Sequence, residues 1–352
     1  MIDWTASMQQ SFEYYMVNPI TWKDEKKINF VKTSTINRDS TVETKGSSSF
    51  DITESINECY IRTYLKIVQD GKQYREPLAT SLVQTPSSKF DGMVRTITVD
   101  GYTPLLELKE NQPPLGYSIA KNENIMAMAH RLAQEQSRAP VIETSCTETL
   151  YNDFVANTDD TWITYLGDLI ANAKYEFGVD EMGRVLFLPI QETASLQPIW
   201  EYSDGNSSII QPNIDLDHDI YGIPNVVEVL YSNGNGYYYA KAVNDDENSP
   251  ISTVNRGRTI THRINDPDLN GYATQRQIDE YAERVLRELS SLEYTLTYTH
   301  GYCPVRIGDC VRLNYEKANL KNIKAKVVSQ SIKCETGCLV TEKAVFTVKL
   351  WG

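Results

Sequence analysis

Four of the six cysteines lie near the C-terminus and are the first residues whose type and spacing could bind a metal. They are Cys303, Cys310, Cys334 and Cys338. Four thiolates can hold Zn²⁺ or an iron–sulfur cluster. The spacings here are Cys-x6-Cys and Cys-x3-Cys, without the Cys-x2-Cys unit that is typical of such sites. We therefore expect buried free thiols, and a metal or iron–sulfur site at these positions is the alternative.

A second candidate site is the dense ionisable cluster in the middle of the chain, which comprises Asp215, Asp217, His218 and Asp219. Carboxylates at alternate positions could hold a metal ion or supply a general acid and a general base. In an extended segment the three aspartates point to the same side, and the sequence identifies no distant partner for them. We expect a solvated polar loop before Pro224, and a metal or acid–base site is the alternative.

The segment Asp266-Pro-Asp268-Leu-Asn270-Gly271 matches the first half of a calcium-binding EF-hand loop. Such a loop has oxygen ligands at alternate positions, glycine at the sixth position and glutamate at the twelfth. Here the twelfth residue is Gln277, which forms a capping-box pattern with Thr274 at the start of a helix. We expect an ordinary turn before a helix, and a calcium site is the alternative.

The histidines do not belong to a recognisable catalytic motif. His130 lies in a stretch of apolar and small residues, and His262 lies between Thr261 and Arg263. The sequence contains no Gly-x-Ser-x-Gly, no His-Glu-x-x-His and no phosphate-binding glycine loop. We expect structural histidines, no catalytic, cofactor-binding or metal-binding residues, and no enzyme activity.

Tyrosine is the most frequent aromatic residue, with 22 tyrosines beside 8 phenylalanines and 5 tryptophans. Two groups are consecutive, Tyr14-Tyr15 and Tyr237-Tyr238-Tyr239. Tyrosine is favoured at surfaces that are exposed to water in the free protein and buried in a complex, such as protein interfaces. Exposed strand faces also use it, so both interpretations remain open.

The negative charge is concentrated in the middle of the 352-residue chain, whose net charge is −13. Between residues 143 and 255, nineteen acidic residues stand against Lys174, Arg184 and Lys241. Tight binding of duplex DNA needs clustered Lys and Arg, so we do not expect it. An acidic surface that lines a channel would repel phosphate and let DNA slide past it; the sign of the charge is the basis of this hypothesis. No apolar run is long enough for a membrane helix, and Asp3 and Trp4 stand where a secretory signal would be apolar or basic. We expect assembly in the cytoplasm.

The periodicity changes twice along the chain. Alternating apolar and polar residues predict strands, and apolar residues at helical spacing predict helices. Strands are expected at 28–36, 48–53, 59–69, 74–84 and 93–99, helices at 125–133, 162–173 and 278–292, hairpins at 174–190 and 226–243, and further strands at 305–314, 323–332 and 339–350. The chain is too long for one core of ordinary size, so we expect at least two domains.

This order of elements resembles the baseplate hub or tail hub proteins of long-tailed bacteriophages, the late-control protein D-like family. The segments Thr35-Ile-Asn-Arg-Asp-Ser-Thr41 and Val99-Asp-Gly-Tyr-Thr-Pro-Leu-Leu106 are similar to parts of the family's first barrel. The segment from Ile278 through His300-Gly-Tyr-Cys-Pro-Val-Arg-Ile-Gly-Asp-Cys-Val-Arg-Leu313 is similar to its late helix and second barrel.

The resemblance implies an α+β, mainly β fold with two tube-forming β-barrel domains, separated by a helical and hairpin insert, that builds a pseudo-sixfold ring as a trimer. The expected domains are an N-terminal arm (1–21), a first β-barrel tube domain (22–110), an α/β insert (111–200), an acidic β segment (201–272), and a helix with a second β-barrel tube domain (273–352).

The implied function is that of a structural virion protein: a homotrimeric hub that joins the sixfold tail tube to the threefold tip or spike and encloses the DNA channel. The implied partners are the tail tube or distal tail protein, the tip or spike protein, other baseplate proteins and the tape measure protein, and DNA passes through the lumen without specific binding. No membrane anchor is expected, and the protein would act in the virion tail after assembly in the host cytoplasm. The alternatives are a tail-tip cell-wall hydrolase that uses carboxylates such as Asp217, and a carbohydrate-binding adhesin that uses its tyrosine clusters.

Overall fold

The computed structural model describes residues 2–90, 92, 95–205, 208–232, 236–269 and 273–351. Contacts divide the chain into two compact units. Unit 1 comprises Met1–Ile214 and Thr297–Ala344, and unit 2 comprises Asp215–Leu296 and Val345–Gly352. Among the described residues, no helix is both long and apolar enough to cross a membrane.

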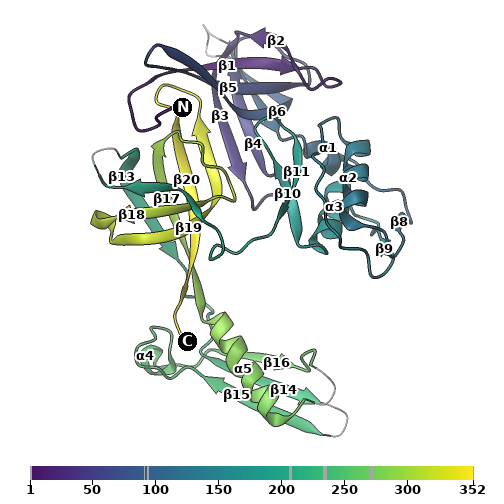
Figure 1. The fold of residues 1–352 in the computed structure, drawn as a ribbon, viewed down its shortest axis with the longest axis vertical. Coiled ribbons are helices and arrows are strands. Elements are labelled where there is room, and N and C mark those ends of the chain that lie inside the picture. The colour runs from purple at the N-terminus through teal and green to yellow at the C-terminus, as the bar shows by residue number, and fades with distance from the viewer. Residues whose placement is uncertain are drawn as a thin grey trace. The chain divides into compact units, whose positions relative to one another are not determined.

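The largest element of the fold is a 13-stranded sheet (Figure 1). Its order is β13-β17-β20-β19-β3-β4-β7-β6-β5-β1-β2, and off this path β18 pairs with β19 and β12 pairs with β18. The strands are β1 (Gln9–Val17), β2 (Asp24–Ile28), β3 (Val31–Asp39), β4 (Gly46–Ile52), β5 (Cys59–Gln69), β6 (Lys72–Phe90), β7 (Arg95–Tyr102), β12 (Pro198–Ser203), β13 (Ile210–His218), β17 (Ser291–Gly301), β18 (Cys310–Tyr315), β19 (Leu320–Lys333) and β20 (Leu339–Lys349). Between β18 and β19 lies the short 3-10 helix η1 (Glu316–Ala318).

The described strands of this sheet do not close into the two barrels that the family resemblance implied. The early and late strands are joined by antiparallel pairing of β3 with β19, with Ile36 opposite Ile332. Both side chains are buried in a core cluster that also contains Leu65 and Val340. The two strand-rich parts of the chain therefore share one sheet and part of one core. The mainly β character was predicted correctly, but sequence patterns did not reveal this pairing between distant strands.

Strand β5 occupies its predicted bounds but differs from the prediction in burial. The alternation predicted one buried face, whereas side chains on both faces are buried. Ile61 and Leu65 pack into strand cores, and Tyr60 and Arg62 on the opposite face are each 1% exposed. The second face is covered because the chain between β1 and β2 and the tip of a later hairpin pack over it.

The helical insert and its hairpin confirm the sequence prediction. Helices α2 (Ile125–Gln136) and α3 (Trp162–Ala171) pack on each other and bury apolar residues at helical spacing. The hairpin of β10 (Tyr175–Val179) and β11 (Val185–Pro189) joins the same core. The insert also contains α1 (Leu106–Glu110), β8 (Ser118–Ile119) and β9 (Phe154–Val155).

Unit 2 contains a three-stranded sheet with one helix packed on it. The sheet order is β15-β14-β16, formed by β14 (Val226–Ser232), β15 (Tyr237–Val243) and β16 (Thr261–Asn265). Helix α5 (Gln275–Leu289) packs on β14 and β15, and α4 (Thr253–Arg256) is a single turn. The predicted capping box is present, since Gln277 Oε1 accepts a hydrogen bond from the backbone N–H of Thr274.

The grouping of α5 differs from the expected domain boundaries. The sequence assigned this helix to one domain with the last strands, whereas its buried residues Ile278, Ala282 and Leu286 pack against Val227 and Val229. This packing arises because the hairpin of β14 and β15 has an apolar face that needs a cover. Residues 233–235 of the hairpin turn, and Asn270 and Gly271 of the EF-hand-like segment, lie outside the described residues.

Candidate functional site

The four C-terminal cysteines are all buried and free, and they lie in different surroundings. Cys334 and Cys338 belong to the apolar cluster around Ile36, whereas Cys303 lies beside Tyr202. Burial raises the pKa of the Cys334 thiol to about 12 and also raises that of Cys338. Among the described residues, no group of three or more His, Cys, Asp or Glu side chains is placed to hold a metal ion. The geometry therefore gives no support to a metal or iron–sulfur site at these cysteines.

A buried polar network in unit 1 brings together several ionisable side chains from distant strands. Glu342 on β20 accepts a hydrogen bond from the hydroxyl of Tyr298 on β17, and its other oxygen accepts one from Gln330 Nε2 at 2.7 Å. His300 Nε2 lies 3.4 Å from Glu342 Oε2 and 3.1 Å from the Tyr202 hydroxyl. His300 and Glu342 are both 0% exposed.

Electrostatics favour a charged His300 paired with Glu342. Burial disfavours the imidazolium, but hydrogen bonds to Cys303 and Glu342 and the glutamate charge outweigh it and raise the pKa of His300 to about 10. Burial and the same carboxylate raise the pKa of Tyr298 far above its usual value. The network is thus a buried ion pair with neutral phenols around it.

The arrangement of Cys303, His300 and Glu342 contains the residue types of a nucleophile, a base and an orienting carboxylate. Cys303 Sγ lies 3.9 Å from His300 Nδ1. The cysteine is 1% exposed, so no substrate reaches it in this state. Sequence reasoning missed the network because Tyr202 and Glu342 lie far along the chain from His300, and only the sheet pairing brings them together.

A second network, also absent from the sequence analysis, anchors the hairpin tip (residues 180–183) between β10 and β11. Trp22 Nε1 donates to the carbonyl of Met182 at 2.7 Å, and Arg62 Nη2 donates to the same oxygen at 3.0 Å. Arg62 also contacts Asp24 at 2.8 Å and Thr80 at 2.8 Å. The buried guanidinium therefore joins three segments of unit 1.

Glu181 at this tip connects both networks. Its carboxylate lies 3.5 Å from Arg38 Nη2 and 2.6 Å from Arg306 Nε. Arg38 Nη1 in turn donates to Gln330 Oε1 at 3.1 Å, and Gln330 donates to Glu342. A continuous chain of polar contacts thus runs from the hairpin tip to the late strands. These contacts hold parts of the fold together rather than form a reaction centre.

The acidic cluster on and after β13 does not come together with a distant partner among the described residues. Asp215, Asp217, His218 and Asp219 are all exposed. The His218 ring stacks on Tyr294 with centroids 4.8 Å apart. Asp219 Oδ1 accepts a hydrogen bond from the backbone N–H of Tyr221 at 2.7 Å. The arrangement is that of a solvated segment, without the paired geometry that acid–base catalysis needs.

The remaining sequence candidates have structural surroundings. His130 Nε2 lies 3.2 Å from the Val141 carbonyl, and His262 is exposed on β16. Tyr14 is buried against Phe50, with ring centroids 6.3 Å apart. By contrast Tyr237 and Tyr239 are 80% and 53% exposed on β15. The two tyrosine groups therefore differ, and only the second one offers rings to a partner.

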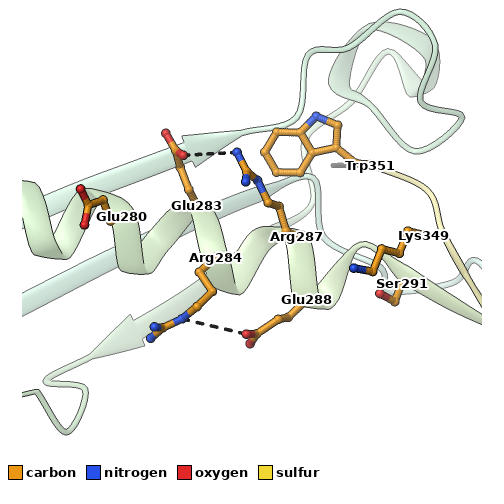
Figure 2. Close-up of a pocket in the computed structure, with 8 residues that line it drawn as sticks. All are labelled: Glu280, Glu283, Arg284, Arg287, Glu288, Ser291, Lys349 and Trp351. Atoms are coloured by element: carbon orange, nitrogen blue, oxygen red, sulfur yellow. Dashed lines mark ion pairs between the residues drawn. The ribbon is translucent and has the colours of Figure 1, made fainter. Parts of the chain in front are cut away.

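Unit 2 has a groove of about 660 Å³ between α5 and the C-terminal residues. Figure 2 shows the side chains that line it. The groove is lined by Glu280, Glu283, Arg284, Arg287, Glu288, Ser291, Lys349 and Trp351. Arg287 pairs with Glu283 at 3.6 Å and Arg284 with Glu288 at 4.0 Å. Three acidic side chains balance three basic ones, so the lining shows no preference for a charged ligand.

No protein-family model matches the sequence, and no curated protein matches it. Solved structures do match its fold. The prophage MuSo2 43 kDa tail protein from Shewanella oneidensis matches with a TM-score of 0.65 and 13% identity, over 97% of this chain and 99% of that chain. A tail protein from Neisseria meningitidis MC58 matches with a TM-score of 0.63 and 12% identity, over 96% of both chains.

A chain of the Francisella PdpA–VgrG complex matches with a TM-score of 0.54 and 7% identity, over 98% of this chain and 53% of that chain. These likenesses define the class of the fold. This chain has the mainly β fold seen in bacteriophage tail proteins. Over their full lengths, the two tail proteins from Shewanella and Neisseria are similar to it.

Proposed function

We propose that this protein is a structural component of a bacteriophage tail that forms a homotrimeric hub. In this role it joins the sixfold tail tube, or the distal tail protein, to a threefold tip or spike and encloses the channel for DNA. The observation that carries the proposal is the full-length likeness in fold to two tail proteins, which extends over at least 96% of each chain. Other baseplate proteins and the tape measure protein would be further partners.

The open edges of the main sheet support an assembly of several copies. Strands β2 and β13 end the strand order, and among the described strands each pairs on one side only. An unpaired edge exposes backbone N–H and C=O groups that a neighbouring chain can satisfy. When an edge strand of one copy contacts a different surface of the next copy, the copies form a closed ring if the rotation between neighbours divides a full turn evenly.

The buried position of the best catalytic constellation supports a non-enzymatic role. Cys303, His300 and Glu342 are at most 1% exposed, and the exposed acidic segment has no paired partner. Incubation with purified peptidoglycan should therefore release no soluble fragments. Hydrolysis that is lost in Asp217→Asn would favour the cell-wall hydrolase instead.

Light scattering after gel filtration tests the oligomeric state, with the expected mass three times the 40.0 kDa of the chain. Electron microscopy of the same sample should show rings with a central hole. Copurification from infected cells should recover tail tube and spike proteins. A stable monomer at high concentration that binds no tail protein would contradict the proposal.

A further inference from the structure

In one part of the main sheet in unit 1, one face belongs to the core and the other face consists largely of hydroxyl side chains. Six neighbouring strands contribute to this second face, in the order β17-β20-β19-β3-β4-β7. We call it the hydroxyl face. Its members are Thr297 and Thr299 on β17, Thr341 and Lys343 on β20, Ser329, Ser331 and Lys333 on β19, Thr33, Thr35, Asn37 and Asp39 on β3, Ser47, Ser49 and Asp51 on β4, and Thr98 and Asp100 on β7.

Strand register places these side chains beside one another. Asn37 lies opposite Ser331 on β19 and opposite Ser47 on β4, and Ser49 lies opposite both Thr35 and Asp100. Side chains alternate along a strand, so directly opposite residues share a face of the sheet. The residues between them, such as Ile36, Phe50 and Ile332, are buried in the core.

Hydrogen bonds connect the hydroxyl face across strands. Thr299 and Thr341 lie 3.1 Å apart through their hydroxyls, and Ser331 Oγ donates to Asn37 Oδ1 at 2.8 Å. Thr98 Oγ1 donates to Asp51 Oδ1 at 2.7 Å. Apart from Lys333 and Lys343 the side chains of this face are short, and these hydrogen bonds connect six of them in pairs.

The hydroxyl face has neither of the two properties that make a surface adhere to DNA. Its charges nearly cancel, with Lys333 and Lys343 against Asp39, Asp51 and Asp100. None of the exposed large apolar side chains that the structure describes lies on these six strands. Tyr102 on β7 lies opposite Ser47 on the same face, but it is partly buried and packs against a core cluster. Affinity for DNA phosphates needs clustered Lys and Arg, and affinity for bases needs aromatic platforms.

We propose that the hydroxyl face lines the channel of the assembled ring and that its partner is the DNA duplex, which slides over it without binding. This inference rests on the proposed function. Hydroxyl groups exchange hydrogen bonds with water and phosphate at little net cost, so no position along the wall holds the duplex. A face destined for a protein interface would instead have an apolar centre with aromatic anchors.

Cysteine accessibility in the assembled ring tests the placement. The background variant is Cys59→Ser/Cys146→Ser, because the other four cysteines are buried. Into it, Ser49→Cys or Ser331→Cys is introduced, with Gln112→Cys, an exposed position outside the hydroxyl face, as the matched control. Each ring is treated with a small maleimide or with a maleimide attached to a folded protein too wide for a DNA-sized channel.

The expected result is labelling of the two face positions by the small reagent only, and labelling of the control by both. Labelling of the face by the bulky reagent would place it on the outside of the ring, and failure of both reagents would place it in a protein interface. Either outcome overturns the inference while leaving the ring intact. A chain that forms no ring overturns the proposed function and this inference with it.

Binding of a fluorescent duplex tests the partner. The unmodified ring should retain no duplex at physiological salt, whereas Ser49→Lys/Ser331→Lys should retain it in a salt-dependent manner. Gln112→Lys adds charge elsewhere and should not. Retention by the unmodified ring, or equal retention by all lysine variants, would contradict a channel wall over which DNA slides.

Discussion

The carboxylate of Glu181 lies 2.6 Å from Nε of Arg306, although the two residues come from a hairpin tip in the insert and from the loop after β17. The same carboxylate oxygen lies 3.5 Å from Arg38 on β3. One acidic side chain thus holds three segments of unit 1 together. Because Arg38 also contacts Gln330, the hairpin tip is coupled to the pairing of β3 with β19.

Replacing Glu181 with glutamine should destabilise unit 1. The Arg306 side chain is 61% exposed, so water can solvate its charge when the carboxylate is removed. The Arg38 side chain is only 12% exposed, so its charge would stay buried without its counterion. We expect a loss of about 2 kcal/mol in the free energy of unfolding. Glu43→Gln is the matched control, because its pair with Lys109 is about half exposed and should contribute less than about 0.5 kcal/mol. Urea unfolding of both variants gives the comparison, and equal losses would show that Glu181 has no special role.

Replacing Arg62 with methionine should be more damaging. Arg62 is 1% exposed, and its guanidinium hydrogen-bonds Asp24, Thr80 and the Met182 carbonyl. Methionine fills similar space but cannot form these three hydrogen bonds. The Met182 carbonyl keeps its bond from Trp22, and Asp24 keeps its contacts with Tyr64 and Arg75, so we expect a loss of about 3 kcal/mol, about 1 kcal/mol for each lost bond. Arg312→Met removes a surface pair at 3.8 Å and should change stability by less than about 0.5 kcal/mol. A small effect of Arg62→Met, measured by thermal unfolding, would contradict this account of the hairpin tip.

Gly183 is needed at the hairpin tip because its backbone has a positive φ and because neighbouring side chains leave no room for a Cβ. Gly116 is a control that separates these two reasons. The φ of Gly183 is +74°, and an added Cβ would lie 2.7 Å from Thr80 Cβ and 3.1 Å from Trp22. Gly116 has a similar φ of +77° but open space around it. Gly116→Ala should cost about 1 kcal/mol for backbone strain alone, and Gly183→Ala about 3 kcal/mol because the hairpin tip must also move away. If denaturant unfolding gives the same cost for both, the close approach is not important.

Local elements of this fold could be predicted from the sequence, because each depends on residues a few positions apart. The apolar spacing from Trp162 to Ala171 and the capping pair Thr274 and Gln277 lie where expected. The pairing of β3 with β19 could not be predicted, because it joins residues almost 300 positions apart without a local signal. For the same reason the strand patterns predicted two separate groups of strands, which the family resemblance led us to expect as two barrels, instead of one shared sheet.

Unlike the local elements of the fold, the networks of polar side chains could not be predicted from the sequence. Sequence analysis drew attention to clusters of chemistry-bearing residues that are adjacent in the chain, such as Asp215 and Asp217, and these remain solvated. The networks that the structure reveals instead use single residues from distant strands. Arg62 and His300 each stand alone in the sequence, and a lone histidine or arginine in a strand gives no indication of its partner. Their partners follow from burial, because a buried charge must be paired.

The ion pair of His300 and Glu342 predicts a stability that falls as the pH rises. The pKa of His300 is raised from its usual 6.5 to about 10 in the folded chain, so its contribution is complete below pH 6.5 and is lost as the pH increases toward 10. In this window the folded state binds one more proton than the unfolded state, and the free energy of unfolding should fall by about 1.4 kcal/mol per pH unit. Measurements up to about pH 7.5 isolate this effect, because the cysteines and tyrosines whose pKa values are also raised have unfolded pKa values of 9.0 and 10.0 and are almost fully protonated in both states at this pH.

Urea unfolding between pH 6.5 and 7.5, followed by tryptophan fluorescence, measures this slope. Four of the five tryptophans, Trp4, Trp22, Trp162 and Trp200, belong to unit 1, so the signal mainly reports the unit that contains the ion pair. His300→Gln keeps a hydrogen-bonding side chain of similar size but does not titrate. It should lower the stability at pH 6.5, because Glu342 loses its counterion inside the core, and it should also flatten the pH dependence. An unchanged slope in this variant would mean that another group causes the pH dependence and that His300 is neutral in the folded chain.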